Sequence, residues 1–468
     1  MKSDITRQLS ASVYQNSSLR DQILNFVKDN HRAIINSNGL DIGEILKHTF
    51  NAKRVERKYF IGLFLPAIIF WVGILLALGG GLMKEDIMLL STYWAFVVSY
   101  IIVIVRDINS RNFLKQNLSK YSYNDDFQYS DNKKNLESIN SFINRISGNV
   151  IFYSGYSPFV GCGIDIGGWS LVVDIDKGKR EIDQKSTPIS FEVSELYSTI
   201  SKEINSLRLP NLTVQDKIFI NGKTIRNNRE LLPNELAHPV QNISTIYKEA
   251  VMNNSVRDAR FYKVFQIIDW EGDLILSTFF RLQKDEKTLF IENNYFLIPP
   301  IKEEFKAIDT VKVHSGIKYY FVWLGELFFR TFIHTIWSII KVSGYAMEKV
   351  NEIFESEKSA MLKLVRSSPD FDYGASTSIR EEVSQPNYAQ YFQKLDKERY
   401  LKTIEKRLFN LIGDFLDEKN IDSSEFKERE IGILNHGVII TGGKLISENI
   451  TVGKKSKINL GNNEKIGK

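Results

Sequence analysis

The stretch YFIGLFLPAIIFWVGILLALGGGLM at residues 59–83 decides the fold, because it runs for 25 residues without a charged side chain. A second uncharged run of 19 residues, 87–105, follows after Lys84, Glu85 and Asp86. An α-helix rises about 1.5 Å per residue, so roughly 20 apolar residues cross the hydrocarbon of a bilayer. A buried helix of a soluble domain rarely extends so far without a charge. The two runs therefore predict a transmembrane helical hairpin.

Basic side chains flank the hairpin on its outer sides. Residues 53–58 contain two lysines and two arginines, and residues 106–115 contain two arginines and a lysine. The short turn between the two runs offers only Lys84. Because basic flanking segments stay on the cytoplasmic side of a membrane, we expect both termini in the cytoplasm.

The remaining composition is that of a protein that mostly faces water. The chain has 468 residues, enough for two or three domains, and its mean hydropathy is −0.20. With 61 basic and 56 acidic residues it is too balanced to suggest nucleic-acid binding. The six histidines show no pair at metal-ligand spacing, so we predict neither a metal site nor a cofactor.

The single cysteine, Cys162, cannot form a disulfide within the chain, which agrees with a cytoplasmic location. No histidine or lysine stands beside it in the sequence to lower its pKa. We therefore interpret Cys162 as a buried structural thiol rather than a nucleophile.

Outside the hairpin the pattern predicts an α+β fold with membrane helices. Runs of β-branched and aromatic residues punctuated by glycine begin near residue 149, and Asn221-Gly222 is typical of a β-hairpin turn. We expect a mainly antiparallel cytoplasmic α+β domain and a helical C-terminal region. The predicted segments are a helical cytoplasmic segment at 1–58, the transmembrane hairpin at 59–105, a linker and helix at 106–148, the α+β domain at 149–310, an amphipathic helix at 311–350, a helical region at 351–432 and a β-prone tail at 433–468.

Residues 317–342 form an aromatic-rich helix with a polar stripe, since Glu326, Arg330 and His334 recur at every fourth position. We interpret the stripe as a membrane-facing or gating feature, on a helix in the membrane interface or against the hairpin. A buried helix of the soluble domain is the next alternative. A third span is disfavoured, because ionisable groups are costly in hydrocarbon.

A second helical pattern covers residues 387–419. Apolar residues at alternating spacings of three and four are typical of a coiled-coil seam between two copies of a chain. They are Leu401, Ile404, Leu408, Leu411 and Phe415. Two heptads do not separate this interpretation from an ordinary amphipathic helix packed on its own domain.

Two features of the expected α+β domain are candidate ligand-binding elements. The first is a glycine-rich stretch with Gly155, Gly161 and Gly163, which matches neither GxGxxG nor a Walker loop and also suits tight turns. The second is Asp174 and Asp176, whose alternation in a strand would place both carboxylates on one face. Such a pair can bind a cation or act in acid–base chemistry, although solvated charges at a strand end are the alternative. No recognised catalytic motif is present, so the catalytic residues stay unknown.

Five segments together resemble a group of bacterial hypothetical membrane proteins of unknown function. The segments are DIGEILKH (41–48), YSGYSPFVGCG (153–163), FDYGASTSIRE (371–381), YFQKLDKERYLKTIEKR (391–407) and LNHGVIITGG (434–443). The resemblance covers nearly the whole chain. It implies a bacterial inner-membrane protein and carries no activity or catalytic residue. The tail is also similar to strand-like recruiting tails of bacterial conflict and defence systems.

These observations lead to the hypothesis of a membrane-anchored cytoplasmic sensor or effector. It would couple the binding of a partner or ligand to the inner membrane, with defence or stress response as one version. Its expected partners are the lipid bilayer, a second copy of the chain, and a protein bound through the C-terminal tail. The alternatives are a tethered enzyme with its site in 149–310 and a passive scaffold that recruits partners through the tail.

Overall fold

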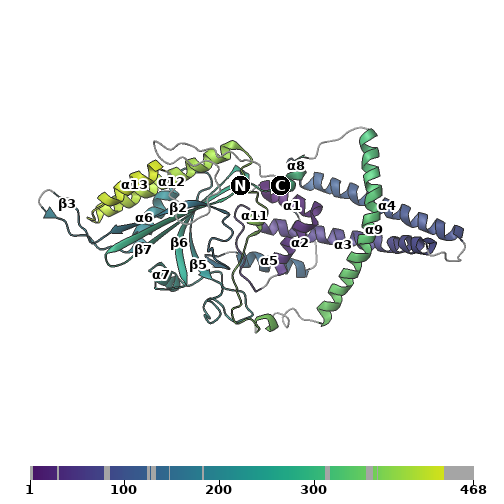
Figure 1. Ribbon diagram of the computed structural model, residues 1–468, viewed down its shortest axis with the longest axis horizontal. Helices are drawn as coiled ribbons and strands as arrows, with labels where there is room; N and C mark the ends of the chain where they lie inside the picture. The colour runs from purple at the N-terminus through teal and green to yellow at the C-terminus, as the bar shows by residue number, and fades with distance from the viewer. Residues whose placement is uncertain are drawn as a thin grey trace, which may run out of the picture. The chain divides into compact units, whose positions relative to one another are not determined.

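The chain passes back and forth between two units in the computed structural model (Figure 1). The structure describes residues 4–28, 31–78, 85–123, 127, 133–146, 148–181, 184–253, 255–310, 317–354, 362–365 and 367–436. The first unit comprises Met1–Gly148, Gly222–Gln241 and Ile301–Val383, and the second comprises Asn149–Asn221, Asn242–Pro300 and Ser384–Lys468.

The described part of the first unit is built from helices. They are α1 (Asp4–Gln15), α2 (Ser17–Lys28), α3 (Ile42–Leu78), α4 (Glu85–Asn117), α5 (Lys133–Ile146), the 3-10 helix η2 (Glu303–Lys306), α8 (Ala307–Thr310), α9 (Ile317–Phe354) and α11 (Ile379–Glu382). The start of α3 packs with α1, α2 and α5 around a core of buried aliphatic side chains. Apolar residues on one face of each helix explain this core.

Two helices of this unit leave that core and extend far beyond it. Helix α3 is 37 residues long with Pro66 inside it, and α4 is 33 residues long. Within the predicted helical segment at 1–58, α1 and α2 are separate helices, whereas residues 42–58 run without a break into the first apolar stretch, because no residue between 42 and 58 ends a helix. Helix α9, green in Figure 1, runs steeply across both α3 and α4 and contacts each of them.

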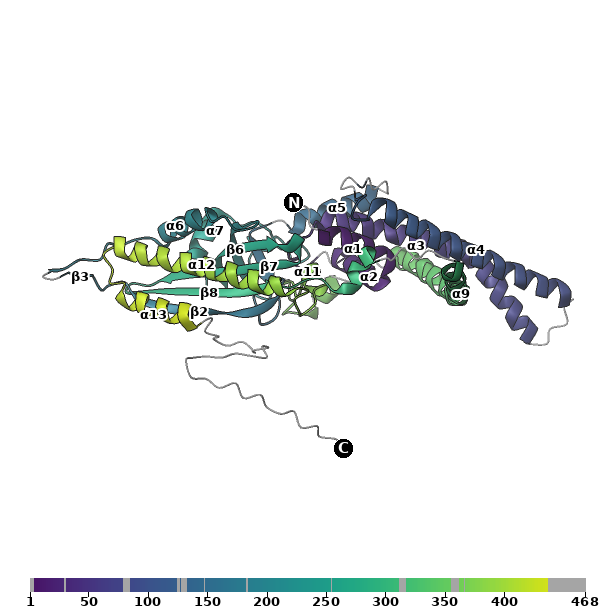
Figure 2. The same ribbon diagram turned by 90° about the horizontal axis from the view of Figure 1, so that it is seen from above.

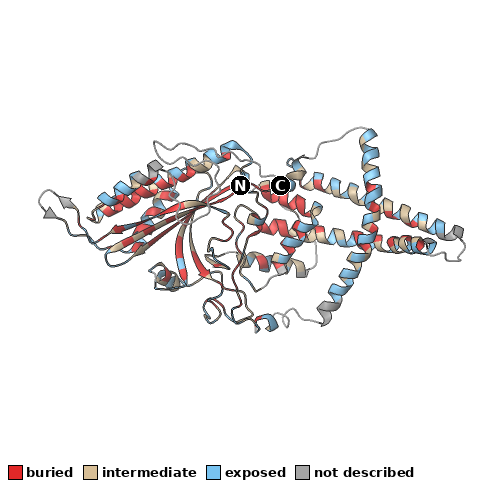
Figure 3. Ribbon diagram, viewed as in Figure 1, coloured by how far each residue is buried: buried red, intermediate tan, exposed pale blue. Residues whose placement is uncertain are grey.

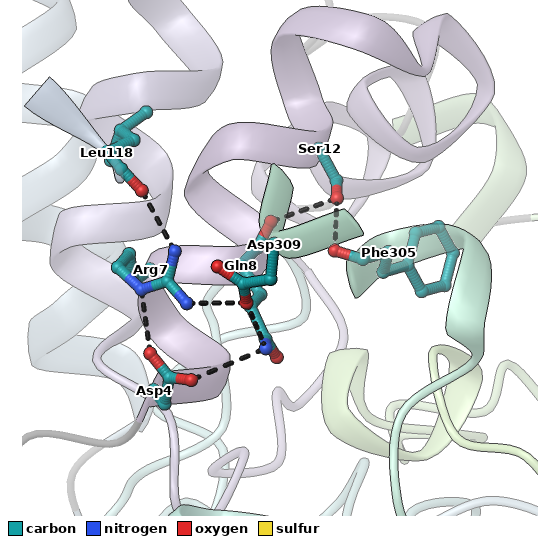
Figure 4. A network of polar contacts seen from close by, with 7 residues as sticks. All are labelled: Asp4, Arg7, Gln8, Ser12, Leu118, Phe305 and Asp309. Carbon is teal, nitrogen blue, oxygen red and sulfur yellow. Dashed lines mark hydrogen bonds and ion pairs between the residues drawn. The ribbon is translucent and has the colours of Figure 1, made fainter. Parts of the chain in front are cut away.

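A polar network joins the end of α4 to the segment that precedes α9 (Figure 4). The buried Arg7 of α1 donates to the Leu118 carbonyl (2.9 Å), and its guanidinium pairs with Asp4 and with Asp309 of α8. Burial alone raises the pKa of Asp309, but hydrogen bonds from Arg7 and Gln8 outweigh it, so the pKa lies below its usual value. The network therefore fixes α1, α4 and α8 to one another.

The second unit contains a six-stranded sheet in the order β1-β5-β6-β7-β8-β2. Its strands are β1 (Val150–Tyr153), β2 (Ile164–Asp174), β5 (Thr213–Asn221), β6 (Ala259–Asp269), β7 (Leu274–Lys284) and β8 (Thr288–Ile298). Only β1 and β5 pair in parallel, and the remaining pairs are antiparallel. A separate small ribbon consists of β3 (Arg180–Glu181) and β4 (Gln184–Lys185). The mainly antiparallel α+β domain is confirmed in this form.

Helices cover one face of the sheet, as Figure 2 shows for α12 and α13. They are α6 (Val193–Asn205), α7 (Thr245–Met252), α12 (Tyr391–Glu418) and α13 (Ser424–His436). Helix α12 packs on α6, α13 and β7. Between β6 and β7 lies the 3-10 helix η1 (Trp270–Gly272). Its backbone needs positive φ at Glu271 (55°) and Gly272 (98°).

The second unit differs in extent from the predicted 149–310 domain. It excludes Gly222–Gln241 and takes in the helices after Ser384. The prediction of a hairpin turn at Asn221-Gly222 was wrong, because β5 pairs with β6, which begins only at Ala259. At Gly222 a Cβ would overlap the backbone nitrogen of Gly374, so a close approach of two chain segments requires this glycine. The strands expected in the tail at 433–468 lie outside the described residues, apart from the end of α13.

Candidate functional site

The crossing of α3, α4 and α9 is the candidate site, and polar side chains form its inner surface. Thr331, Thr335 and Ser338 of α9 are fully buried, at 0% exposure. Trp71 of α3 donates its indole N–H to the Thr335 hydroxyl (3.0 Å), and the Ser338 hydroxyl donates to the Phe60 carbonyl (2.9 Å). Small hydroxyl side chains let two helices approach closely and satisfy their own polar atoms in the contact.

One flank of α9 meets α3 and α4 where their apolar stretches give way to basic residues. The Tyr59 hydroxyl and His334 Nδ1 are hydrogen-bonded at 2.6 Å, and the Arg106 guanidinium lies 4.4 Å from the centre of the Tyr59 ring. Trp323 donates its indole N–H to Asp107 (2.9 Å). We call this row, formed by Arg57, Tyr59, Arg106 and Asp107, the hairpin base. It is polar and aromatic, and its charges are paired with ring faces or carboxylates.

The opposite flank of α9 meets α3 and α4 further along their apolar stretches. The ring of Phe332 lies 5.8 Å from Phe70 of α3 and 4.7 Å from Phe96 of α4. Phe328 lies 5.1 Å from Phe96. This flank contains no charged side chain at the contact. Helix α9 therefore contacts the polar hairpin base with a polar flank, and it contacts the apolar stretches of α3 and α4 with an apolar flank.

Apolar residues of α9 that do not contact the hairpin are exposed, and Figure 3 colours these stretches of the helix pale blue. Phe329 is 71% exposed, Phe321 is 70% exposed and Ile340 is 54% exposed. The exposed large apolar residues of this arc are Phe321, Val322, Phe329, Ile333, Ile336, Ile340 and Met347. A helix of a water-soluble protein would bury such a face and expose its threonines and serines. Helix α9 does the reverse.

The stripe expected on this helix is divided by the structure. Arg330 pairs with Glu326 at 2.9 Å, and both side chains are about half exposed, at 50% and 56%. His334 instead faces Tyr59. His334 alone of the three has a contact with the hairpin base. Each step of four residues back along the helix turns the side chain by about 40°, so Arg330 and Glu326 lie progressively closer to the exposed face of α9.

Helices α3 and α4 are the two described helices that are long and apolar enough to cross a membrane. In their most apolar stretches only 28% and 17% of the residues are buried inside the protein. Leu65 and Leu75 of α3, and Leu89 and Tyr93 of α4, are each more than half exposed. Core helices of a soluble protein are mostly buried, so the exposure separates these two from ordinary core helices.

The glycine-rich stretch of the second unit forms turns on either side of Phe159, whose ring packs on the sheet. Gly155, Gly161 and Gly163 all have positive φ, at 85°, 77° and 88°. A Cβ at Gly163 would overlap the Leu297 carbonyl oxygen, whereas nothing lies within 4 Å of one at Gly155. Phe159 between them packs against the ring of Phe296 at 4.7 Å, within an aromatic cluster on the sheet. These glycines serve chain geometry rather than forming a phosphate loop.

The structure does not bring the glycines and the aspartates together. Gly163 precedes β2 and Asp174 ends it, so roughly 33 Å of extended strand separates them. Asp174 pairs with Lys177, and Asp176 lies beyond the strand, so strand alternation does not place both carboxylates on one face. Among the residues that the structure describes, no group of three His, Cys, Asp or Glu side chains could hold a metal ion.

Cys162 is a buried thiol, as expected, but it has a basic neighbour that the sequence did not indicate. Lys217 of β5 lies close enough for the thiol to influence it. Burial lowers the pKa of Lys217, and the Cys162 thiol partly opposes that shift. The turn that contains Cys162 packs on the face of the sheet beside Phe219 of β5, which brings the thiol near Lys217 across 55 positions of sequence. No local sequence motif indicates this contact.

A buried polar cluster holds α12 against the sheet. Tyr295 of β8 donates its hydroxyl to Glu405 of α12, and it accepts hydrogen bonds from Trp169 (2.7 Å) and Asn293 (3.0 Å). Glu405 is 5% exposed, and burial raises its pKa. Trp169 also stacks on Phe409 of α12 at 4.6 Å. The cluster is internal and sets the register of α12 on the sheet.

The structure favours the second of the two interpretations of the apolar spacing in α12. Leu401, Ile404, Leu408, Leu411 and Phe415 are between 0% and 7% exposed within one chain. They face the sheet, α6 and α13, so they are not available to a second copy. The alternative of an amphipathic helix packed on its own domain describes α12 correctly.

The inner stripe of α9 is the feature that sequence reasoning missed. Thr331, Thr335 and Ser338 follow one another at spacings of four and three, which places them on one face. That spacing of small hydroxyl residues in an otherwise aromatic helix is the signal that could have revealed a helix–helix contact.

No curated protein and no solved structure matches the chain. One family model does match, the AbeC-like domain, over residues 168–447. The match includes α9, α12 and most of the sheet, and its description states no activity, ligand or partner. It covers more than half of the 468 residues, and the chain therefore belongs to the family of proteins with an AbeC-like domain.

Proposed function

We propose that the chain is a membrane-anchored bacterial protein whose α3 and α4 cross the inner membrane as a hairpin, with both termini in the cytoplasm. The second unit then works at the cytoplasmic surface, where it binds a partner or ligand and couples that event to the membrane. A role in defence or stress response is one form of this proposal.

The exposed apolar surface of α3 and α4 carries the proposal. Large apolar side chains such as Leu65, Leu75 and Leu89 are 66%, 66% and 59% exposed on helices that extend beyond any soluble core. Each buried CH₂ group is worth about 0.8 kcal/mol, so leaving such surfaces in water would be strongly unfavourable. Hydrocarbon removes that cost. The paired basic flanks at 53–58 and 106–115 support the orientation.

Thiol labelling in intact cells tests the topology. Cys162→Ser removes the native thiol, and single cysteines are then introduced as Glu85→Cys, Tyr121→Cys and Ile246→Cys. Glu85 follows the first apolar run, whereas Tyr121 and Ile246 are 100% and 80% exposed in the two units, so a reagent can reach them if it shares their compartment. We expect a membrane-impermeant maleimide to label only Glu85→Cys in intact spheroplasts, and all three after permeabilisation.

Each other pattern contradicts a stated part of the proposal. Labelling of Ile246→Cys in intact spheroplasts places the second unit outside the cell. Protection of Glu85→Cys until permeabilisation means that α3 and α4 do not cross the membrane.

A further inference from the structure

We infer that α9 is an interfacial helix: it lies flat in the cytoplasmic leaflet of the same bilayer, with its exposed aromatic arc in the lipid. The inference rests on the proposed crossing by α3 and α4 and adds a third, non-spanning membrane element. It also assigns the lipid-facing surface to the arc around Phe329 rather than to the stripe of Glu326, Arg330 and His334.

The two ends of α9 lie at the same depth along the hairpin. Helices α3 and α4 are antiparallel, and the contact of Tyr59 with Arg106 sets Arg57 level with Asp107. Near one end of α9, Trp323 bonds to Asp107, and near the other the ring of Tyr345 lies 5.5 Å from the Arg57 guanidinium. These two α9 residues are about 33 Å apart along the helix axis. A spanning helix would place them on opposite sides of the bilayer.

The middle of α9 lies close to the hairpin base, displaced from it toward the apolar stretches of α3 and α4. It fits between the row of Tyr59 and the row of Phe70 and Phe96, which are about 16 Å apart along α3 at 1.5 Å per residue. A helix with side chains is about 10 Å wide, so the axis of α9 lies about 8 Å from the base. Interfacial amphipathic helices bury their apolar face by roughly that depth.

The polarity of α9 matches this depth. Its contacts toward the hairpin base are made by His334, Trp323 and Tyr345, and its contacts toward the hydrocarbon are made by Phe328 and Phe332. The charged pair of Glu326 and Arg330 is about half exposed and lies one and two turns before His334, between the base flank and the exposed face, so both side chains can extend toward headgroups and water. Indole and phenol rings at the base match the amphipathic aromatic side chains found at membrane interfaces.

These features favour the lipid bilayer as the partner that covers the exposed apolar face of α9. A protein partner would need a matching apolar surface along all of α9, whereas the bilayer already surrounds the adjoining apolar surfaces of α3 and α4. The exposed arc on α9 continues from Phe328 and Phe332, which contact those surfaces directly. The same lipid phase therefore covers both.

Depth-dependent fluorescence quenching tests the inference on the full chain in phosphatidylcholine–phosphatidylglycerol vesicles. In the Cys162→Ser background, an environment-sensitive dye is attached at Leu75→Cys, Phe329→Cys or Glu326→Cys. The three native side chains are 66%, 71% and 56% exposed on the protein, so protein packing excludes the dye from none of these positions. The quenchers are iodide in the water and spin-labelled lipids with the label near the headgroup or near the acyl-chain end.

We expect the dye at Leu75 to be quenched by the deep label, the dye at Phe329 by the shallow label, and the dye at Glu326 by iodide. Iodide quenching at Phe329 should be several-fold weaker than at Glu326. If iodide quenches Phe329 as strongly as Glu326 while Leu75 stays protected, the anchor stands and the interfacial helix is refuted. Quenching of Phe329 by the deep label would show a third span and also refute it. Iodide quenching at Leu75 would overturn the anchor itself.

Discussion

Helices α9 and α12 are both long and rich in large apolar residues, and they place those residues in opposite directions. Helix α12 buries Leu408 and Phe415 against the sheet of its own unit. Helix α9 buries Thr331, Thr335 and Ser338 and exposes Phe329. The difference teaches that the surroundings of a helix cannot be read from its composition. The first packing is that of a helix folded in water, and the second suits a helix packed in lipid.

The largest effect should come from emptying the inner face of α12. Leu408→Ala removes a fully buried side chain (0% exposed) and should lower the free energy of unfolding by about 3 kcal/mol, since the cavity adds to the lost burial. The rate at which a thiol reagent reaches Cys162, the single thiol and a buried one, reports opening of this unit in detergent-solubilised full-length protein.

The matched control is Leu395→Ala on the same helix, where the side chain is 44% exposed. That change should alter Cys162 labelling several-fold less. Equal effects from the two variants would mean that α12 is not anchored through its inner face.

A smaller loss should follow from adding bulk to the inner face of α9. Ser338→Leu introduces a large side chain at a fully buried position and removes the hydrogen bond to the Phe60 carbonyl. Overpacking of this kind costs roughly 1–3 kcal/mol. We expect the variant to lower the midpoint of thermal unfolding in detergent micelles.

Gly325→Leu is the control for that experiment, because nothing lies within 4 Å of a Cβ at this exposed position. It should leave the midpoint unchanged or raise it slightly, since leucine is a better helix former than glycine. A larger loss for Gly325→Leu than for Ser338→Leu would reverse the assignment of the inner and outer faces of α9.

Some of this fold could be predicted from local patterns. The uncharged runs at 59–83 and 87–105 predicted two long helices, and α3 and α4 contain them. Runs of β-branched and aromatic residues from residue 149 predicted a mainly antiparallel sheet, and β1, β2 and β5 to β8 form it. Period and turn chemistry act within a few residues, so a single sequence displays them.

What could not be predicted depends on contacts between distant segments. The spacing of Leu401, Ile404 and Leu408 is the same for a seam between chains and for a helix packed on its own sheet. Only the position of α12 decides between them. Gly222 resembled a turn residue, but the backbone of Gly374 requires it. The separation of the two candidate ligand-binding elements was hidden for the same reason, because the length of a strand sets the distance from Gly163 to Asp174.

The smallest effect, and one that sharpens the description of α12, is a pH dependence at Glu405. Burial raises the pKa of this carboxyl above its usual 4.5. The folded state therefore binds the proton more tightly than the unfolded state, and the stability of the unit falls as pH rises through the interval between the two pKa values. Glu405→Gln keeps an oxygen that can accept from Tyr295 and removes the titration. The free energy of unfolding of the variant minus that of the native chain should increase as pH rises above 4.5, and then level off above the folded pKa.

Isothermal urea titrations followed by Cys162 labelling, calibrated at each pH, measure this difference. A difference that stays constant with pH would mean that Glu405 titrates alike in both states. The carboxylate would then be solvated rather than enclosed between α12 and the sheet.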